Sequence, residues 1–285
     1  MKYINSLHEI KNDYNVFLFD QWGVIHNGKK LYPNVEKIFE YLLEEKKIIY
    51  VVSNSGKKSF DNIGRLKQMG ANYVLKAEII TSGDVCLNYL IESKGPCKNL
   101  GLKYYPIGID YPLLKNTKFN KTINLEEADF LLLTSTAGFN DFEKAHSHMR
   151  KALKLNIPLI CSNPDILGIS GNDVHPSTGD LALYYKKIGG KTYIFGKPGH
   201  EIYEYVLTKS SKNKNEILMI GDSLFNDIAG ANNFGIDSLL IKNGIHSKNF
   251  SENISDIDTI KNIKSDLQVT GMPDYIIDEI KWFLT

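Results

Sequence analysis

Short runs of apolar residues recur along the chain, and each run is followed by polar or turn-forming residues. The runs are three to five residues long and contain many β-branched side chains, which is typical of strands buried on both faces of a parallel sheet. The runs that predict such strands cover residues 16–19, 48–52, 130–133, 157–161, 193–195, 217–220 and 238–241.

Helical patterns lie between these runs. In residues 33–46 the apolar side chains recur at spacings of three and four, so they fall on one face of a helix. These side chains are Val35, Ile38, Phe39, Leu42 and Leu43. Residues 60–69, 142–155 and 201–209 show the same kind of pattern. Strands that alternate with helices predict an α/β fold built on a parallel sheet.

The alternation weakens between residues 92 and 124, where Pro96, Pro106 and Pro112 stand among several glycines and no long helical stripe occurs. Strand and helix order resumes afterwards. A chain of 285 residues is long for one domain, since domains usually hold about 100–150 residues. We therefore expect a core domain made of residues 1–82 and 192–285, interrupted by an inserted α/β domain of residues 83–191.

The composition is that of an ordinary globular protein, with 42% hydrophobic and 24% charged residues. The 34 basic residues balance the 33 acidic ones, so no basic surface for nucleic acid is expected. The three cysteines match neither a disulfide framework nor a zinc site. No apolar segment is long enough to cross a membrane, and the first residues lack the features of a signal peptide. These features predict a cytoplasmic protein that binds neither nucleic acid nor membranes.

Four polar clusters follow the predicted strands, at the point where each strand ends. Ligands of open parallel sheets bind where the carboxyl ends of the strands meet, so clusters that are far apart in sequence can form one site. Asp20 ends the first apolar strand before a glycine-containing turn, and Ser53 and Asn54 follow the second before a helix. Taken alone, Asp20 is explained equally well as a turn-capping residue, and Ser53 is explained better as a helix cap.

The third cluster contains Lys197, and the fourth carries Asp222 and Asp227 on either side of a turn into a helix. A lone lysine in a turn is usually just solvated. Two carboxylates close to Asp20 would repel one another unless a cation lay between them, and carboxylate oxygens are ligands that Mg²⁺ prefers. The fourth cluster therefore indicates a magnesium site, with helix capping as the weaker alternative.

The order and spacing of these clusters resemble the haloacid dehalogenase-like phosphatase superfamily, and more narrowly its class IIA, or NagD-type, branch. The similarity covers nearly the whole chain, including an insertion of the right size. Residues Asn163, Pro164 and Asp165 support the branch, because an Asn-Pro-Asp turn is typical of its cap domain; an ordinary turn is the alternative. The resemblance implies a Rossmann-like three-layer core with an inserted α/β cap, and Asn163 and Asp165 on the substrate side of that cap.

The resemblance also implies a catalytic mechanism. Asp20 would attack the substrate phosphorus in line and form an aspartyl-phosphate, which water would then hydrolyse. Ser53 and Asn54 would hold the phosphoryl oxygens, and Lys197 would neutralise their charge. Positioning and electrostatic stabilisation dominate the catalysis of phosphoryl transfer.

The resemblance implies a metal site as well. Mg²⁺ would be bound by the carboxylates of Asp20 and Asp222 and by the backbone carbonyl of Trp22. Asp227 would support the site through Lys197 or through water on the metal. The cofactor expected from the sequence is therefore Mg²⁺.

The first cluster departs from the family at one position. The family has a second aspartate two residues after the nucleophile, which protonates the leaving group and later activates water, whereas this chain has Trp22. Indole has no useful proton chemistry, and general acid–base catalysis is worth about 10²–10⁴ in rate, so slow hydrolysis of alkyl phosphates is expected. His26 and His200 are candidates to replace the missing group, although a lone histidine near a loop is more often structural.

Three functions fit these residues. The leading hypothesis is a magnesium-dependent phosphatase, a phosphoric monoester hydrolase, that acts on a small phosphorylated metabolite. The second is a regulatory protein that binds a phosphorylated ligand with little turnover, and the third is a phosphotransferase. Substrate choice should depend on residues 94–124 and 165–177. By analogy alone, a homodimer formed through the cap is a further expectation.

Overall fold

The structure is a computed structural model that describes residues 1–170, 173–251 and 253–282. The chain divides into two compact units. The core unit consists of Met1–Ser53, Asn62–Ile80 and Lys197–Thr285, and the inserted unit consists of Asn54–Asp61 and Thr81–Gly196. The chain therefore leaves the core unit twice before it returns at Lys197.

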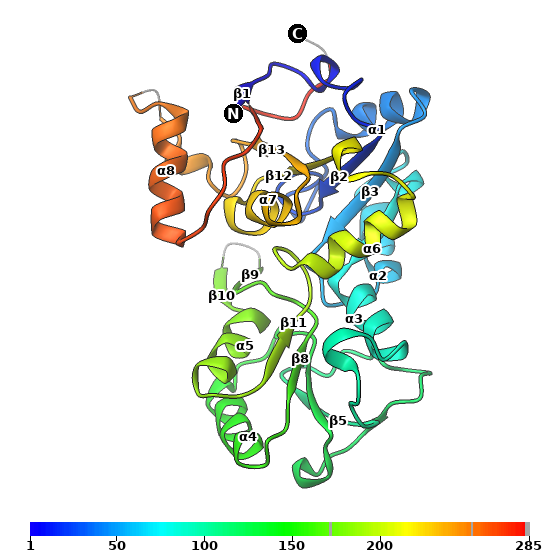
Figure 1. Ribbon diagram of the computed structural model, residues 1–285, viewed down its shortest axis with the longest axis vertical. Helices are drawn as coiled ribbons and strands as arrows, with labels where there is room; N and C mark the ends of the chain where they lie inside the picture. The colour runs from blue at the N-terminus through cyan, green and yellow to red at the C-terminus, as the bar shows by residue number, and fades with distance from the viewer. Residues whose placement is uncertain (171–172, 252, 283–285) are drawn as a thin grey trace. The chain divides into compact units, whose positions relative to one another are not determined.

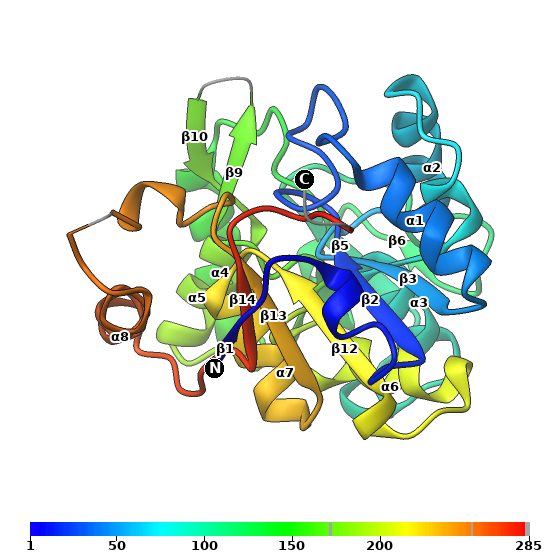
Figure 2. The ribbon, with the colours of Figure 1, turned by 90° about the horizontal axis from the view of Figure 1, so that it is seen from above.

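In the described part of the core unit, seven strands form one sheet in the order β1-β14-β13-β12-β2-β3-β4. Neighbouring strands from β1 through to β3 pair in parallel, and Figure 2 shows them side by side. The strands are β1 (Lys2–Tyr3), β2 (Val16–Asp20), β3 (Ile48–Ser53), β4 (Glu78–Thr81), β12 (Ile217–Gly221), β13 (Asp237–Ile241) and β14 (Tyr275–Ile277). The predicted α/β fold with a parallel sheet is confirmed.

Strand β2 lies inside this sheet, between β12 and β3. Its first four residues are almost completely buried, which explains why the run is apolar without alternation. Asp20 pairs with Val52 of β3, and Phe19 pairs with Ile220 of β12. This register brings the carboxyl ends of the three strands to the same edge of the sheet, where Asp20 and the residues after β3 and β12 are found.

Five α-helices lie wholly or mostly in the described part of the core unit: α1 (Val35–Glu44), α2 (Ser59–Gln68), α6 (His200–Ser210), α7 (Ala229–Phe234) and α8 (Asp256–Leu267). The apolar stripe predicted for α1 is confirmed, since Val35, Ile38, Phe39 and Leu42 are all buried. The ring of Phe39 lies 4.7 Å from that of Phe19 on β2. Packing of this kind fixes the strand whose last residue is Asp20.

In the described residues of the inserted unit, five strands form a second sheet in the order β11-β8-β7-β5-β6, and their pairings are parallel. Helices α4 and α5 pack on this sheet through a common core, and α3 is drawn on its other side (Figure 1). The elements are α3 (Ser82–Ile91), β5 (Lys103–Ile107), β6 (Asn120–Lys121), β7 (Phe130–Leu133), α4 (Phe142–Lys154), β8 (Leu159–Cys161), α5 (Thr178–Lys187), β11 (Thr192–Ile194) and an antiparallel hairpin of β9 (Leu167–Ser170) and β10 (Asp173–Pro176).

The unit boundaries differ from the expected division in three places, at residues 54–61, 81–82 and 192–196. Strand β11 pairs with β8, so residues 192–196 belong to the inserted unit and not to the core. Residues 54–61 also fall in the inserted unit, where the hydroxyl of Ser162 donates to the carbonyl of Gly56 at 3.2 Å. The differences at residues 54–61 and 192–196 arise from contacts between distant parts of the chain, which a local sequence pattern does not report.

The stretch from residue 92 to residue 124 is more regular than its sequence suggests, because it contains β5 and β6. Pro106 lies inside β5 and pairs with Leu132 of β7. Proline cannot donate a hydrogen bond to a ladder and is rare inside strands, so it hid this strand from the sequence pattern. The ladder between β5 and β6 ends at Tyr104, and at Pro106 only one side of β5 is paired.

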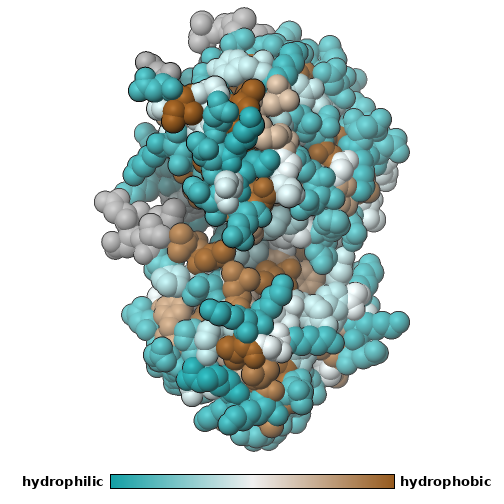
Figure 3. Space-filling view, turned by 60° about the vertical axis from the view of Figure 1, so that its left-hand side comes forward, coloured by the Kyte–Doolittle hydropathy of each residue, from teal (hydrophilic) through white to brown (hydrophobic). Residues whose placement is uncertain are grey.

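The surface and the three cysteines also bear on the expectations from composition. On the face drawn in Figure 3, hydrophobic side chains form small groups among hydrophilic ones. No helix among the described residues is long and apolar enough to cross a membrane. Cys86, Cys97 and Cys161 are buried free thiols, and burial raises the pKa of each of them. They are therefore poor nucleophiles.

Candidate active site

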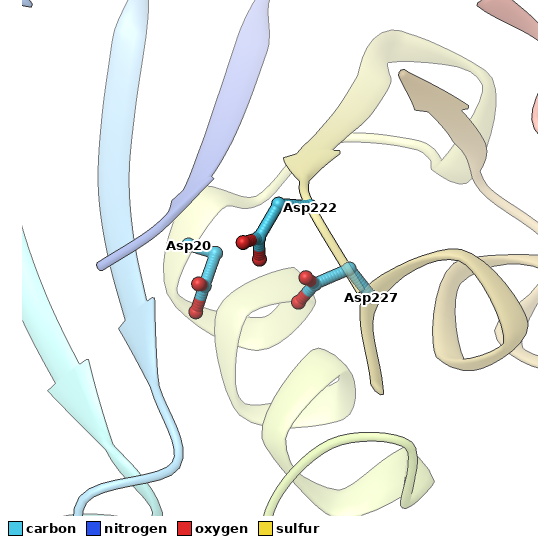
Figure 4. A group of neighbouring side chains, drawn as sticks. All are labelled: Asp20, Asp222 and Asp227. Carbon is cyan, nitrogen blue, oxygen red and sulfur yellow. The ribbon is translucent and has the colours of Figure 1, made fainter. Parts of the chain in front are cut away.

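Three carboxylates converge at the carboxyl edge of the core sheet. Asp20 ends β2, Asp222 directly follows β12, and Asp227 lies in the turn Leu224–Ile228 that leads into α7. Each offers one oxygen, and these oxygens all lie within 4.8 Å of one another. Figure 4 shows the carboxylates of Asp20, Asp222 and Asp227 gathered around a common point. The predicted meeting of residues from distant parts of the sequence therefore occurs within the core unit.

Lys197 lies beside these carboxylates. Its side chain is 1% exposed, and its Nζ donates to Oδ1 of Asp20 at 2.5 Å and to Oδ1 of Asp227 at 2.7 Å. The other oxygen of Asp227 accepts the backbone N–H of Ser223 at 3.0 Å. Asp227 is thus held on both oxygens and in turn holds the ammonium group.

The electrostatics of the cluster favour an additional positive charge. Burial raises the pKa of Asp20; Lys197 lowers it, but Asp227 and Asp222 raise it further, and the result lies well above the ordinary value. Burial and the charge of Asp227 raise the pKa of Asp222 to about 7. Burial alone would lower the pKa of Lys197, but the two carboxylates outweigh it, so this ammonium stays protonated. When all three carboxylates are ionised, the single ammonium does not balance their charge in this poorly solvated place, and a bound cation would do so.

The donor set fits a hard divalent cation such as Mg²⁺, which takes oxygen ligands. Asp222 is oriented by the backbone N–H of Ile245, which donates to its Oδ2 at 2.8 Å. In the turn after Asp20, the carbonyls of Gln21 and His26 accept backbone hydrogen bonds. Among the described residues, no backbone N–H in this turn donates to the carbonyl of Trp22. The expected ligand set of two carboxylates and one carbonyl is therefore compatible with the hydrogen bonds of the turn.

Two glycines pack directly against Asp222. A Cβ atom on Gly23 would lie 2.0 Å from Oδ2 of Asp222, and one on Gly244 would lie 2.2 Å from its Cβ. Gly23 also has a φ angle of +92°, a conformation that disfavours any side chain. The absence of a side chain at these positions allows the backbone to approach the carboxylate and fixes its place.

The variant Gly23→Ala is expected to displace Asp222 and to lower activity by about 10²-fold, the scale on which misplacing a reacting group acts. Backbone strain should add a loss of about 1–3 kcal/mol in stability. Gly64→Ala is the matched control, because nothing lies within 4 Å of its added Cβ and the residue sits inside α2. Activity and thermal melting would be measured for both, and equal behaviour would contradict a role for Gly23.

The variant Asp222→Asn is expected to stabilise the metal-free protein at neutral and higher pH. An unfolded aspartate ionises near pH 4, whereas burial raises the pKa of Asp222 to about 7 in the fold. Ionisation therefore lowers the free energy of unfolding as pH rises from about 4 to 7, and the loss persists above that range. The asparagine, which does not ionise, should be more stable by a few kcal/mol at about pH 8 and by little at about pH 4.

This prediction is checked by urea unfolding in EDTA at both pH values. The asparagine keeps an oxygen that can accept the N–H of Ile245, so the hydrogen bond seen in the wild type is not sacrificed. A stability difference between the variant and the wild type that is the same at both pH values would contradict the raised pKa.

Trp22 is held in place by its neighbours in the core unit. The residue is 38% exposed, the guanidinium of Arg65 lies 5.1 Å from the ring centroid, and His26 meets the ring edge-on at 5.3 Å. A Cβ on Gly28 would lie 2.2 Å from the indole. Trp22 is thus an aromatic group packed between Arg65 and His26, and its indole N–H can donate a hydrogen bond but has no useful proton chemistry.

His26 is a structural residue. The N–H of Gly28 donates to its Nδ1 at 3.0 Å, and its Nε2 lies 3.2 Å from Nε2 of Gln21. Among the described residues, Oε1 of Gln21 has no partner. Turning this amide over lets Oε1 accept Nε2–H of His26 and satisfies both groups. Burial lowers the pKa of His26 to about 4, so the ring is neutral and both of its nitrogens are engaged.

The structure also contains site residues that the sequence reasoning did not single out. Ile245 orients Asp222, and Nε2 of His246 accepts the N–H of Leu224 at 3.2 Å. Both residues follow β13. They could have been found from the rule that ligands bind at the carboxyl ends of parallel strands, which singled out Asp20 and Asp222. Tyr203 on α6 donates to the carbonyl of Asp227 at 3.4 Å. The exposed His200 begins the same helix, and its ring lies 6.0 Å from that of Phe234.

The remaining predicted residues lie in two places. Ser53 ends β3 in the core unit and is buried. Asn54 belongs to the inserted unit, where its amide donates to Oδ1 of Asp165 at 2.9 Å. The side chain of Asn163 accepts the N–H of Asp165 at 2.9 Å. The Asn-Pro-Asp turn and the segment after β3 are thus joined, a contact that the sequence does not indicate.

Comparisons with known proteins agree with this geometry. A model of the haloacid dehalogenase-like hydrolase family matches residues 17–108, which include Asp20. A second model, described as HAD-hydrolase-like, matches residues 194–281, which include Lys197, Asp222 and Asp227. The two matches therefore cover the parts of the chain that supply the acidic cluster and its lysine.

Named relatives point the same way. The dihydroxyacetone phosphatase of Corynebacterium glutamicum (strain R) is 24% identical over 238 residues, which cover 80% of this chain and 81% of the relative. The ribonucleotide monophosphatase NagD of Escherichia coli (strain K12) is 27% identical over 163 residues, 56% of this chain and 60% of NagD. The presence of NagD agrees with the branch expected from the sequence.

A solved structure confirms the fold. The crystal structure of a haloacid dehalogenase-like hydrolase from Brucella suis 1330 matches 97% of this chain and 99% of its own, with a TM-score of 0.79 and 25% sequence identity. The similarity thus extends over the core unit and the inserted unit alike. Together, the family matches, the relatives and the fold show that the chain belongs to the haloacid dehalogenase-like hydrolases.

Proposed function

We propose that this hydrolase is a magnesium-dependent phosphatase that releases phosphate from a small phosphorylated metabolite through an aspartyl-phosphate on Asp20. The observation that carries the proposal is the acidic cluster, in which three carboxylates and one buried lysine meet at the carboxyl edge of the sheet. Two relatives are named dihydroxyacetone phosphatase and ribonucleotide monophosphatase. These names support a small phosphorylated substrate.

In the proposed reaction, Lys197 holds Oδ1 of Asp20, and Oδ2 attacks phosphorus in line. A bond from Oδ2 to phosphorus forms while the bond from phosphorus to the leaving oxygen breaks. Water then attacks the same phosphorus and regenerates the carboxylate. Ser53 and Asn54 are proposed to bind the phosphoryl oxygens, and Lys197 to offset their charge. Asp227 acts as a positioning residue, because it holds the lysine through a bond of 2.7 Å.

The metal would be held by Asp20, Asp222 and the carbonyl of Trp22. When bound, Mg²⁺ supplies positive charge that stabilises the charge developing on the transferred phosphoryl group. It would also offset the repulsion that raises the pKa of Asp20 and Asp222. The inserted unit is proposed to act as the cap that selects the substrate, with Asn163 and Asp165 facing it. Residues 171–172 of the stretch proposed to choose substrate lie outside the described residues.

Phosphate release from a panel of phosphorylated metabolites tests the proposal. Activity is expected to require Mg²⁺, to disappear in EDTA and to return when Mg²⁺ is added in excess. Magnesium at about 100 times its dissociation constant should stabilise the wild type by about 2.7 kcal/mol and should barely affect Asp222→Asn. Equal activity in EDTA and in Mg²⁺ would contradict the proposal.

Because Trp22 cannot act as an acid–base group, a second function is considered: a regulatory protein that binds a phosphorylated ligand with little turnover. Such a protein would show the same thermal stabilisation by Mg²⁺ and phosphate. A turnover number above about one per second, ordinary for enzymes, would rule it out. Stabilisation without phosphate release from any substrate would favour it.

A further inference from the structure

The proposed phosphatase reaction needs help with protons at two points, and this inference rests on that proposed function. In the first step a basic leaving group takes up a proton as it departs, and in the second step water gives one up as it attacks. A positioned acid–base residue commonly performs both transfers. The residue at the corresponding position, Trp22, has no group able to do so.

Four ionisable groups in the described part of the core unit are already engaged in hydrogen bonds or ion pairs. Both ring nitrogens of His26 are occupied by Gly28 and Gln21. Nε2 of His246 is occupied by the N–H of Leu224, and the buried hydroxyl of Tyr203 bonds the backbone of Asp227. Lys197 is bound to two carboxylates. The nitrogen and oxygen atoms named here are engaged in building the site.

Tyr32 is a further group to consider in the described part of the core unit. Burial and the charge of Asp222 raise its pKa, which means that it lies within electrostatic reach of the cluster and would give up a proton reluctantly. Its side chain packs against the core. Tyr32 therefore enters the test as a variant.

We infer that this site acts on phosphoryl donors whose leaving group departs as a stable anion, namely acyl, enol or aryl phosphates and phosphoanhydrides, and that loss of phosphate from Asp20 is the slow step. For such donors, the bond from Oδ2 of Asp20 to phosphorus forms as the bond from phosphorus to the leaving oxygen breaks. The electron pair stays on the leaving oxygen, and no proton is needed.

The second step lacks the same help. Water must form a bond to phosphorus while the bond from phosphorus to Oδ2 breaks, and its proton passes to a phosphoryl oxygen of the product. Without a positioned base, this step loses the factor of about 10²–10⁴ that general base catalysis commonly provides. The phosphorylated enzyme therefore accumulates, and a better nucleophile than water can capture the phosphoryl group.

Rapid-quench kinetics of the full chain with Mg²⁺ and p-nitrophenyl phosphate would test this inference. The expected result is a burst of about one nitrophenol per active site, then a slow steady state, with a phosphoryl adduct on Asp20 detected by mass spectrometry. Phenyl phosphate and glycerol phosphate should show progressively slower first steps, over a range of about 10²–10⁴-fold. Hydroxylamine, which attacks acyl phosphates at the carbonyl carbon and displaces phosphate, should convert the accumulated adduct into a hydroxamate on residue 20 and inactivate the enzyme during turnover.

Three results would overturn the inference: no burst, similar first-step rates for all three substrates, or neither hydroxamate formation nor loss of activity when hydroxylamine is present during turnover. If the three substrates have similar first-step rates in the wild type but different first-step rates in Tyr32→Phe, Tyr32 is the proton donor. These results are distinct from failure of the proposed function, in which no substrate would release phosphate in a manner dependent on Mg²⁺ and Asp20.

Discussion

Replacing Trp22 with aspartate is expected to raise the rate of hydrolysis of alkyl phosphates by about 10²–10⁴-fold, the usual value of general acid–base catalysis. The carboxyl group would stand two residues after Asp20, where a neutral form donates a proton to the leaving group and a charged form accepts one from water. The indole is partly exposed, so its removal should leave the core intact. The measurement is kcat and kcat/KM for glycerol phosphate.

The matched control is Trp22→Asn, because the asparagine side chain has nearly the same shape as the aspartate of the test variant but cannot transfer a proton. Arg65 lies against the present indole, and its charge would lower the pKa of the new carboxyl, so the double variant with Arg65→Gln should be the better acid. Aryl phosphates should gain least in the first step. If Trp22→Asp and Trp22→Asn had equal rates on alkyl phosphates, Trp22 would not mark a missing acid–base group.

Replacing Asp20 with asparagine is expected to lower phosphate release by about 10⁴-fold or more, the scale on which loss of a nucleophile acts. The amide keeps the shape of the side chain but does not attack phosphorus, and it also removes one charge from the metal site. The phosphoryl adduct expected on residue 20 should disappear. Steady-state assays and mass spectrometry of quenched enzyme measure these two effects separately.

Asp13→Asn is the control for this variant, because Asp13 is exposed and lies in the turn before β2. It makes the same chemical change outside the acidic cluster and should leave activity within the error of the assay. The Asp20 variant should also remain folded, since it removes a buried carboxylate whose pKa is raised by burial. Substantial activity of the Asp20 variant would remove this residue from the mechanism.

Much of the fold follows from short-range patterns. The apolar run at residues 16–19 and the helical stripe of Val35, Ile38, Phe39 and Leu42 predicted β2 and α1, and both are confirmed. Burial on both faces makes a strand uniformly apolar, and burial on one face gives a helix its stripe. Elements without these signals were missed. Strand β5 contains Pro106, which is rare inside strands, and β6 and β14 are only two and three residues long.

The site shows the same division between local and distant information. The rule that ligands gather at the carboxyl ends of parallel strands singled out Asp20, Lys197, Asp222 and Asp227, and the structure brings these four together. The same rule was not applied to β13, so Ile245 and His246 were missed. The contact of Asn54 with Asp165 joins residues 111 positions apart and has no local signal.

The amino-acid sequence alone determined the kinds of element, the family resemblance and the identity of the reacting groups, because periodicity and residue chemistry are local properties of the chain. Only the tertiary structure decided that His26 is structural, that Trp22 is held by Arg65 and Gly28, and that β11 joins the inserted sheet. These outcomes depend on which distant backbone and side-chain groups meet. Burial, hydrogen bonding and pKa are set by such meetings and not by the residue types themselves.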